Sequence, residues 1–240
     1  MVIDMQNTNL YVDRGDNVAS NSLYFMNIKL DEIFSTEDII SKLIELDSDD
    51  RFVINDNTES TIDGYYITYY NSKEFRFNED SSILESIIVR KNLIIPFFID
   101  LEKSILDVWS NKSNITRFIN NLCIALDNSV EIDPIFIDLE QICEKLKNRR
   151  IRVKGIKIDN YILEEDIIAN CILDLKNHSN PVEVVKKYSK NLIYLTLVVL
   201  TSEDELLTLI VYRTGSIVVY KNREEITLET LEFIRNILIY

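Results

Sequence analysis

The sequence predicts an α+β protein built from two tandem related units of mainly antiparallel sheet, with helices packed on one face. Short segments rich in β-branched and aromatic residues alternate with polar turns, as antiparallel strands do. A few longer segments carry apolar residues at the spacing of an amphipathic helix. Three short motifs also recur in the same order in the two halves of the chain. We therefore expect an N-terminal arm over residues 1–21, a first unit over residues 22–128 and a second over residues 129–240.

The first unit begins with a strand from Leu23 to Leu30. A helix over residues 35–46 follows, which Ser35 or Thr36 caps, with Glu37 and Asp38 in its first turn. Polar residues 71–73 are expected to form a turn in the β-rich stretch after it. The strands of this stretch are expected at residues 65–70, 74–77, 83–89, 93–101 and 105–109. An amphipathic helix then closes the unit, with Ile115, Phe118, Ile119 and Leu122 on one face.

The second unit begins in the same manner, with a strand from Ile135 to Leu139 and a short helix over residues 139–147. Pro181 suits the first turn of a helix that runs to about Tyr188. Gly215 lies in the turn before the last strand. The further strands are expected at residues 149–159, 168–176, 192–200, 205–212 and 216–221. A helix over residues 228–238 ends the chain.

The internal repeat rests on three matches in order. Residues 28–33 match residues 137–142, both with the pattern Ile-x-Leu-acid-x-Ile. The hairpin at residues 98–108 matches residues 210–220, and Phe118-Ile119-x-Asn121 matches Phe233-Ile234-x-Asn236. Each match alone is weak in a chain so rich in isoleucine, and ordinary α/β units with similar patterning are the alternative explanation.

Two such units would join their sheets across a pseudo-two-fold axis. The order of elements resembles the saddle-like double repeat of the TATA-binding protein. This resemblance implies a shape alone, because no motif is shared residue by residue and a fold does not determine a function.

The chain is acidic, with 26 basic and 40 acidic residues and a net charge of −14. Most of the excess negative charge lies in the first half, over residues 1–128. Such a chain as a whole repels nucleic acid and anionic lipid, so binding to either requires a local basic patch. The simplest interpretation of the acidity is a solvated surface.

Several classes of site are excluded by composition. One histidine, His178, stands in a polar Asn-His-Ser turn, so a histidine-rich metal site is excluded. The chain has no glycine-rich phosphate loop, no Gly-x-Ser-x-Gly elbow and no Cys/His zinc spacing. Hence we expect no cofactor and no metal. Three scattered cysteines, no secretory signal pattern and no apolar run long enough for a bilayer lead us to expect a cytoplasmic protein without membrane contact.

One enzyme-like pattern remains. Asp159 follows one predicted strand, and Asp174 and Lys176 end the next. An acid upstream of Asp-x-Lys resembles the signature of Mg²⁺-dependent restriction-type nucleases, in which two carboxylates hold the metal and the lysine orients a water. The pattern is short, and we favour the alternative that these side chains point outward from a half-buried strand.

The strongest binding feature is a basic segment. Seven basic residues fall within thirteen positions: Lys145, Lys147, Arg149, Arg150, Arg152, Lys154 and Lys157. On a strand, three of them alternate with apolar residues or glycine and so share one face. This face suits nucleic-acid phosphates, or an acidic protein surface such as the N-terminal half of a second copy. A solvated strand face is the alternative without function.

The sequence therefore predicts a non-enzymatic interaction module, an adaptor, regulator or assembly subunit. It would bind a protein partner or a second copy of itself through exposed sheet and the basic strand. A nucleic-acid-binding protein is the second hypothesis, and a Mg²⁺-dependent nuclease is the third.

Overall fold

The computed structural model describes residues 21–31, 34–46, 48–78, 83–145, 150–164, 167–201 and 204–239. The predicted N-terminal arm lies outside these residues except for Asn21, where the first strand begins. The strands are β1 (Asn21–Leu30), β2 (Arg51–Asn57), β3 (Thr61–Asn78), β4 (Ile83–Asp100), β5 (Ile105–Trp109), β6 (Val130–Pro134), β7 (Ile151–Glu164), β8 (Ile167–Asp174), β9 (Leu192–Leu200), β10 (Leu206–Tyr212) and β11 (Ser216–Val219). The helices are α1 (Thr36–Ile44), α2 (Lys112–Ala125), α3 (Leu139–Lys145), α4 (Pro181–Lys187) and α5 (Leu228–Leu238).

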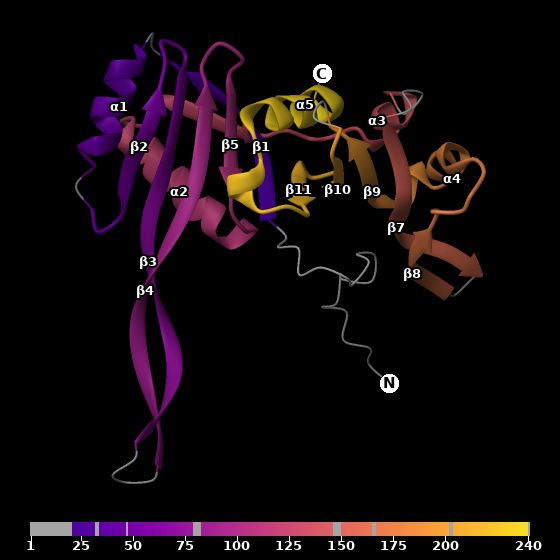
Figure 1. Ribbon diagram of the computed structural model, residues 1–240, viewed down its shortest axis with the longest axis horizontal. Coiled ribbons are helices and arrows are strands. Elements are labelled where there is room, and N and C mark those ends of the chain that lie inside the picture. The colour runs from indigo at the N-terminus through magenta and orange to yellow at the C-terminus, as the bar shows by residue number, and fades with distance from the viewer. Residues whose placement is uncertain are drawn as a thin grey trace.

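All of these strands belong to one sheet of eleven strands (Figure 1). The order of neighbours is β2-β3-β4-β5-β1-β11-β10-β9-β7-β8, and β6 pairs with part of β1. Every strand pair is antiparallel. The α+β class and the mainly antiparallel sheet are therefore confirmed. The two predicted units are not separate sheets, because β1 and β11 join them edge to edge; the duplication stays a prediction.

Helix ends follow the local signals of the sequence. Ser35 is the N-cap of α1: its hydroxyl accepts a hydrogen bond from the Asp38 amide, and the Asp38 carboxylate accepts one from the Ser35 amide, both at 3.1 Å. This reciprocal pair is a capping box. Thr227 caps α5 in the same way, through the amide of Thr230. These local contacts explain why both helices begin where the sequence predicts.

The helices cover opposite faces of the sheet in its two halves. Phe97 and Phe98 are neighbours on β4 and therefore point to opposite faces. The ring of Phe97 packs against Phe118 of α2, at 5.5 Å between centroids, whereas Phe98 lies 5.0 Å from the guanidinium of Arg235 on α5. The two core clusters divide accordingly, one holding the buried side chains of α1 and α2 and the other those of α3, α4 and α5.

The expectation that all helices share one face is therefore wrong. One unbroken sheet passes between the two sets of helices, and α5 also reaches the first half, where Arg235 meets Phe98 of β4 and Asp107 of β5. All five residues of β5 and seven of the nine residues of β9 are buried, so these strands are covered on both faces.

The turn predicted at residues 71–73 is also wrong. β3 continues for 18 residues through Asn71, Ser72 and Lys73, and it pairs with β4 from Thr61 to Asn78. Beyond the sheet these two strands form a long projecting ribbon (Figure 1). Polar residues suit the middle of such a strand, because water reaches both of its faces. The polar run marks exposure and does not mark a turn.

The strand predicted from Ile135 to Leu139 is displaced. The strand is β6, which ends at Pro134, and residues 135–138 lie outside regular secondary structure. Their amides bond to two different neighbours: Ile135 donates to Phe25 and Ile137 to Arg213, each at 3.2 Å. This segment crosses the β10–β11 corner closely, and a Cβ on Gly215 there would lie 2.0 Å from the carbonyl oxygen of Ile135.

Candidate functional site: a cationic groove on the helix-free face

The basic segment lies at the start of β7, on the face opposite to α3, α4 and α5. Ile151 and Val153 are buried in the core beneath those helices, whereas Arg150 and Arg152 are exposed and Lys154 is half-buried. Arg152 lies opposite Val198 of β9. The burial of residues 150–154 therefore alternates as predicted, and Arg152 and Lys154 emerge from β7 on the helix-free side.

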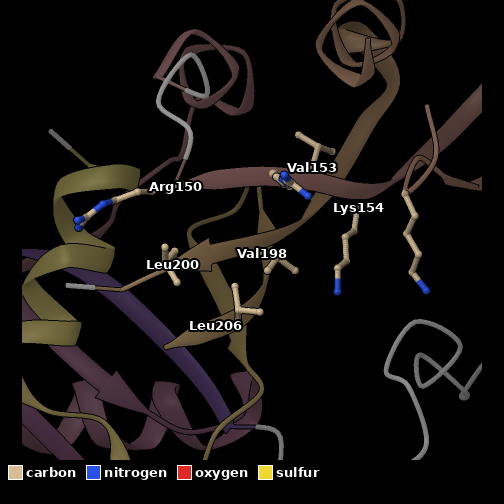
Figure 2. Close-up of a pocket in the computed structure, with 8 residues that line it drawn as sticks. Arg150, Val153, Lys154, Val198, Leu200 and Leu206 are labelled. Carbon is tan, nitrogen blue, oxygen red and sulfur yellow. The ribbon is translucent and has the colours of Figure 1, made fainter. Parts of the chain in front are cut away.

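These cations line a groove of about 440 Å³ (Figure 2). Strands β7, β9 and β10 supply its walls and floor. Its lining residues are Arg150, Arg152, Val153, Lys154, Lys176, Val198, Leu200 and Leu206. In Figure 2 the side chains of Arg150 and Lys154 diverge, so their charges lie at different ends of the groove.

The groove combines charge with aliphatic surface. Four of its lining residues are cationic, and Val198, Leu200 and Leu206 supply aliphatic side chains, whereas the side chain of Val153 points into the core. None of the described lining residues is acidic or aromatic. Leu206 is 75 % exposed, which is unusual for a leucine on a strand. Backbone pairing holds the site in place, since the Leu200 amide donates to the carbonyl of Arg150 at 2.7 Å. The site is therefore built on rigid sheet and has both polar and apolar contacts to offer.

A second hollow of about 370 Å³ adjoins the groove around the end of β8. Arg152 and Lys176 line both hollows, and His178 lines the second. His178 is exposed, and its Nδ1 accepts a hydrogen bond from the Asn180 amide at 3.1 Å. The cationic surface thus continues from β7 toward the start of α4.

Of the other predicted basic residues, the structure describes the side chain of Lys157. Lys157 is half-buried on β7 opposite Ile172 and does not line it. Lys145 ends α3, and its side chain is outside the described part of the chain, as are the whole of Lys147 and Arg149. Among the predicted basic residues whose side chains are described, Arg150, Arg152 and Lys154 line the groove and Lys157 does not.

Sequence reasoning missed the apolar half of the groove. Val198, Leu200 and Leu206 lie on or beside β9 and β10, which follow β7 only after β8 and α4. They meet β7 only because β9 pairs with β7 and β10 with β9. Lys176 enters the sequence-based hypotheses only through the nuclease pattern. The sequence offered one indication of this apolar surface, because Leu206 is an apolar residue that directly follows an acidic stretch.

The acidic residues of the nuclease pattern are separated on the sheet. Asp174 pairs with Gly155 on β7, four residues before Asp159. At about 3.3 Å per residue, their backbone positions are roughly 13 Å apart along the strand. Asp174 accepts a hydrogen bond from the amide of Lys176 at 2.9 Å, which closes a local turn. This arrangement does not bring two carboxylates and a lysine to one metal.

Two further properties of the described residues bear on function. No three His, Cys, Asp or Glu side chains among them gather closely enough to hold a metal ion. Within the same residues, no helix has both the length and the apolar composition needed to cross a bilayer.

Comparison with known proteins adds no family to this picture. No protein-family model matches the chain. A search of curated proteins finds no significant relative. Function must therefore be inferred from the site itself.

Proposed function

We propose that the chain is a non-enzymatic interaction module whose groove on β7, β9 and β10 binds an acidic segment of a protein partner. The observation that carries this proposal is the mixture of four cations with an aliphatic floor. A protein segment with both acidic and apolar side chains satisfies both halves of such a groove. Exposed leucine in a concave site contributes through burial of apolar surface, which is the main source of affinity at protein interfaces.

Nucleic acid is the second candidate. The same four cations suit phosphates, and phosphate contacts supply most non-specific affinity for nucleic acid. Proteins that bind single strands on a sheet usually stack bases on aromatic side chains, and the described lining of this groove has none. This difference favours the protein partner.

The two candidate ligands differ in whether their binding depends on Leu206. Fluorescence anisotropy with a synthetic acidic peptide carrying leucine at every third or fourth position, and separately with oligo-dT, tests both. We expect the peptide to bind, and both Leu206→Ser and the double change Arg152→Glu/Lys154→Glu to weaken it. Lys186→Glu/Lys187→Glu, on exposed positions of α4, is the matched control that retains binding.

Other patterns of binding would contradict the proposed protein partner. Binding of oligo-dT that falls steeply with salt and ignores Leu206→Ser would replace the protein partner with nucleic acid. If neither probe binds, or if the α4 control weakens binding equally, the groove is not the binding site. All of these changes are at exposed or half-exposed positions, so we expect stability to change by about 0.5 kcal/mol or less.

We also infer that the two halves arose by duplication. The amide of Ile28 donates to the carbonyl of Ser104 at the β4–β5 corner, and the amide of Ile137 donates to that of Arg213 at the β10–β11 corner. The two donors are equivalent residues of the first pair of matching motifs. The hairpin match places Ser104 opposite Ser216, so the two acceptors lie in corresponding turns but not at corresponding residues. This shared contact supports two related units divided near residue 128.

The proposal includes an intracellular setting. Cys123 and Cys171 are free in the structure, and both are half-buried. Burial raises the pKa of the Cys123 thiol, which keeps it protonated and unreactive. Free thiols of this kind are typical of proteins in a reducing compartment.

A further inference from the structure

The ribbon formed by β3 and β4 has two unpaired edges. β2 pairs with β3 only as far as Ile67, and β5 pairs with β4 only from Phe97 onward. Among the described strands, residues 68–78 and 83–96 therefore pair only with each other. In Figure 1 this part of the hairpin extends well away from the sheet. An unpaired strand edge offers a row of free amide and carbonyl groups to another strand.

The ribbon also exposes large apolar side chains. Phe75 is 64 % exposed, Phe77 57 %, Leu84 60 % and Ile88 75 %. Phe77 lies opposite Leu84, and Phe75 is two residues from Phe77 on the same face. An isolated two-stranded hairpin is marginally stable in water, and clustered exposed apolar residues mark an interaction surface.

The base of the ribbon is held firmly. The buried carboxylate of Asp50 accepts hydrogen bonds from Tyr66 and Thr68 on β3 and from Arg117 on α2, at 2.6 to 2.8 Å. Arg117 also donates to the carbonyl of Tyr69, at 3.1 Å. α2 thus fixes the direction in which the ribbon leaves the sheet.

We propose that β3 of one molecule pairs antiparallel with β3 of a second copy, across a two-fold axis at Phe75. The occupant is identified by the charges on this edge. Residues 73–77 read Lys-Glu-Phe-Arg-Phe. With the axis at Phe75, Glu74 lies opposite Arg76 of the second copy, and Arg76 lies opposite Glu74 of that copy. The two ion pairs lie on one face of the strand pair and the two Phe75 rings on the other, and cross-strand pairs of these two kinds stabilise sheets.

Charge also selects this register over its neighbours. Moving the axis by one residue in either direction places Glu74 against Glu74 or Arg76 against Arg76. Directly opposed like charges destabilise a strand pair. An axis at Lys73 would place the Lys73 side chains of the two copies opposite each other and would place Glu74 opposite Ser72. The edge is therefore self-complementary in one register.

The same register fits the space beside β3. It pairs residues 72–78 of the two copies, which lie beyond Ile67, where β2 ends its pairing. Lys73 then meets Phe77 of the second copy on the same face as the two Phe75 rings. Within one chain Lys73 already lies over an aromatic ring, 5.8 Å from the centroid of Phe75. An isologous contact of this kind closes after two molecules.

Sedimentation velocity over about 1 to 500 μM protein tests the proposal, because short interfaces bind weakly. We expect the full chain to form dimers within this range. Glu74→Arg and Arg76→Glu should each weaken self-association roughly tenfold or more, since either change converts two attractive pairs into two repulsive ones. Mixing the two variants should restore a dimer, because each copy then meets the opposite charge.

Two controls make the result decisive. Glu59→Lys reverses an exposed charge in the turn before β3, away from residues 72–78, and it should leave the dimer intact. Replacing residues 72–89 by Asn-Gly, a sequence that favours a two-residue hairpin turn between the paired Asn71 and Arg90, should give a folded monomer.

Several outcomes would overturn the proposal. A full chain that stays monomeric throughout the range would do so. A dimer that tolerates both β3 changes, or one that is lost in Glu59→Lys, would also overturn it. If the two β3 variants are monomeric but do not associate when mixed, the proposed register is wrong.

Discussion

Arg235 of the last helix and Asp107 of β5 form an ion pair although 128 residues separate them. Arg235 Nε donates to Asp107 Oδ2 at 3.0 Å, and both side chains are fully buried. Burial raises the pKa of the Asp107 carboxyl to about 6, even though the nearby guanidinium acts to lower it. The carboxylate is thus ionised at neutral pH and depends on Arg235. This pair ties the second half of the chain to the middle of the sheet.

Breaking this pair on one side should be costly. Arg235→Met leaves a buried carboxylate without its cation, and we expect it to lower the free energy of unfolding by about 3–5 kcal/mol. The double change Asp107→Leu/Arg235→Met should recover most of that loss, because Asp107 Oδ1 and Arg235 Nη1 have no hydrogen-bond partner among the described residues. Urea unfolding measures both. A single change costing less than about 1 kcal/mol would contradict the role given to the pair.

The Asp50 network should make stability depend on acid pH. Burial acts to raise the pKa of the Asp50 carboxyl, but hydrogen bonds from Tyr66, Thr68 and Arg117 outweigh it and lower the pKa. The stabilisation is therefore complete above the unfolded pKa of about 3.9, and it is lost as pH falls through the lower folded pKa. Asp50→Asn should cost about 2–4 kcal/mol at pH 7 and less at pH 2 to 3.

Urea unfolding across this pH range tests the prediction. Asp49→Asn is the matched control, since Asp49 is largely exposed and pairs with Arg90 at the surface. It should cost about 0–1 kcal/mol at pH 7. If Asp50→Asn shows the same loss at pH 2 as at pH 7, the charge of Asp50 does not stabilise the fold.

Cutting the chain after Asn128 should leave two unstable fragments. Leu23, Phe25 and Trp109 belong to the first half, yet they pack in the core that lies beneath α3, α4 and α5. The cut also strips β1 of its pairing with β6 and β11. Each fragment then exposes apolar surface and a free strand edge, so we expect aggregation in size-exclusion chromatography. Two soluble fragments with cooperative thermal transitions would show instead that the halves are independent domains.

We expect no Mg²⁺-dependent cleavage of DNA or RNA. Asp159 and Asp174 are separated by four residues along paired strands, and Lys176 follows Asp174 in a local turn. Incubation of plasmid DNA and of a labelled RNA with the protein and Mg²⁺, followed by gel electrophoresis, checks this. Cleavage by the natural chain that disappears in Asp174→Ala, with an unchanged circular dichroism spectrum, would establish the nuclease hypothesis.

Local chemistry determined much of this protein. The capping pattern at Ser35 placed α1, and the apolar spacing after Thr227 placed α5 over Leu228–Leu238 as predicted. β9 spans Leu192–Leu200, also as predicted. The alternation that exposes Arg150 and Arg152 follows from the two-residue period of a strand. These features depend on neighbours a few residues away, so the sequence alone was enough to find them.

Only the tertiary structure decided which strands meet and which faces stay open. Taken alone, the polar residues 71–73 predict a turn. The pairing of β3 with β4 along its whole length shows that they lie in the middle of a ribbon strand. The aliphatic half of the groove, with Leu206, reaches the cations only through the pairing of β7, β9 and β10. The side of the sheet taken by α5 depends on the contact of Arg235 with Asp107. Such contacts join residues up to 128 positions apart, and no local pattern of hydrophobicity or charge specifies them.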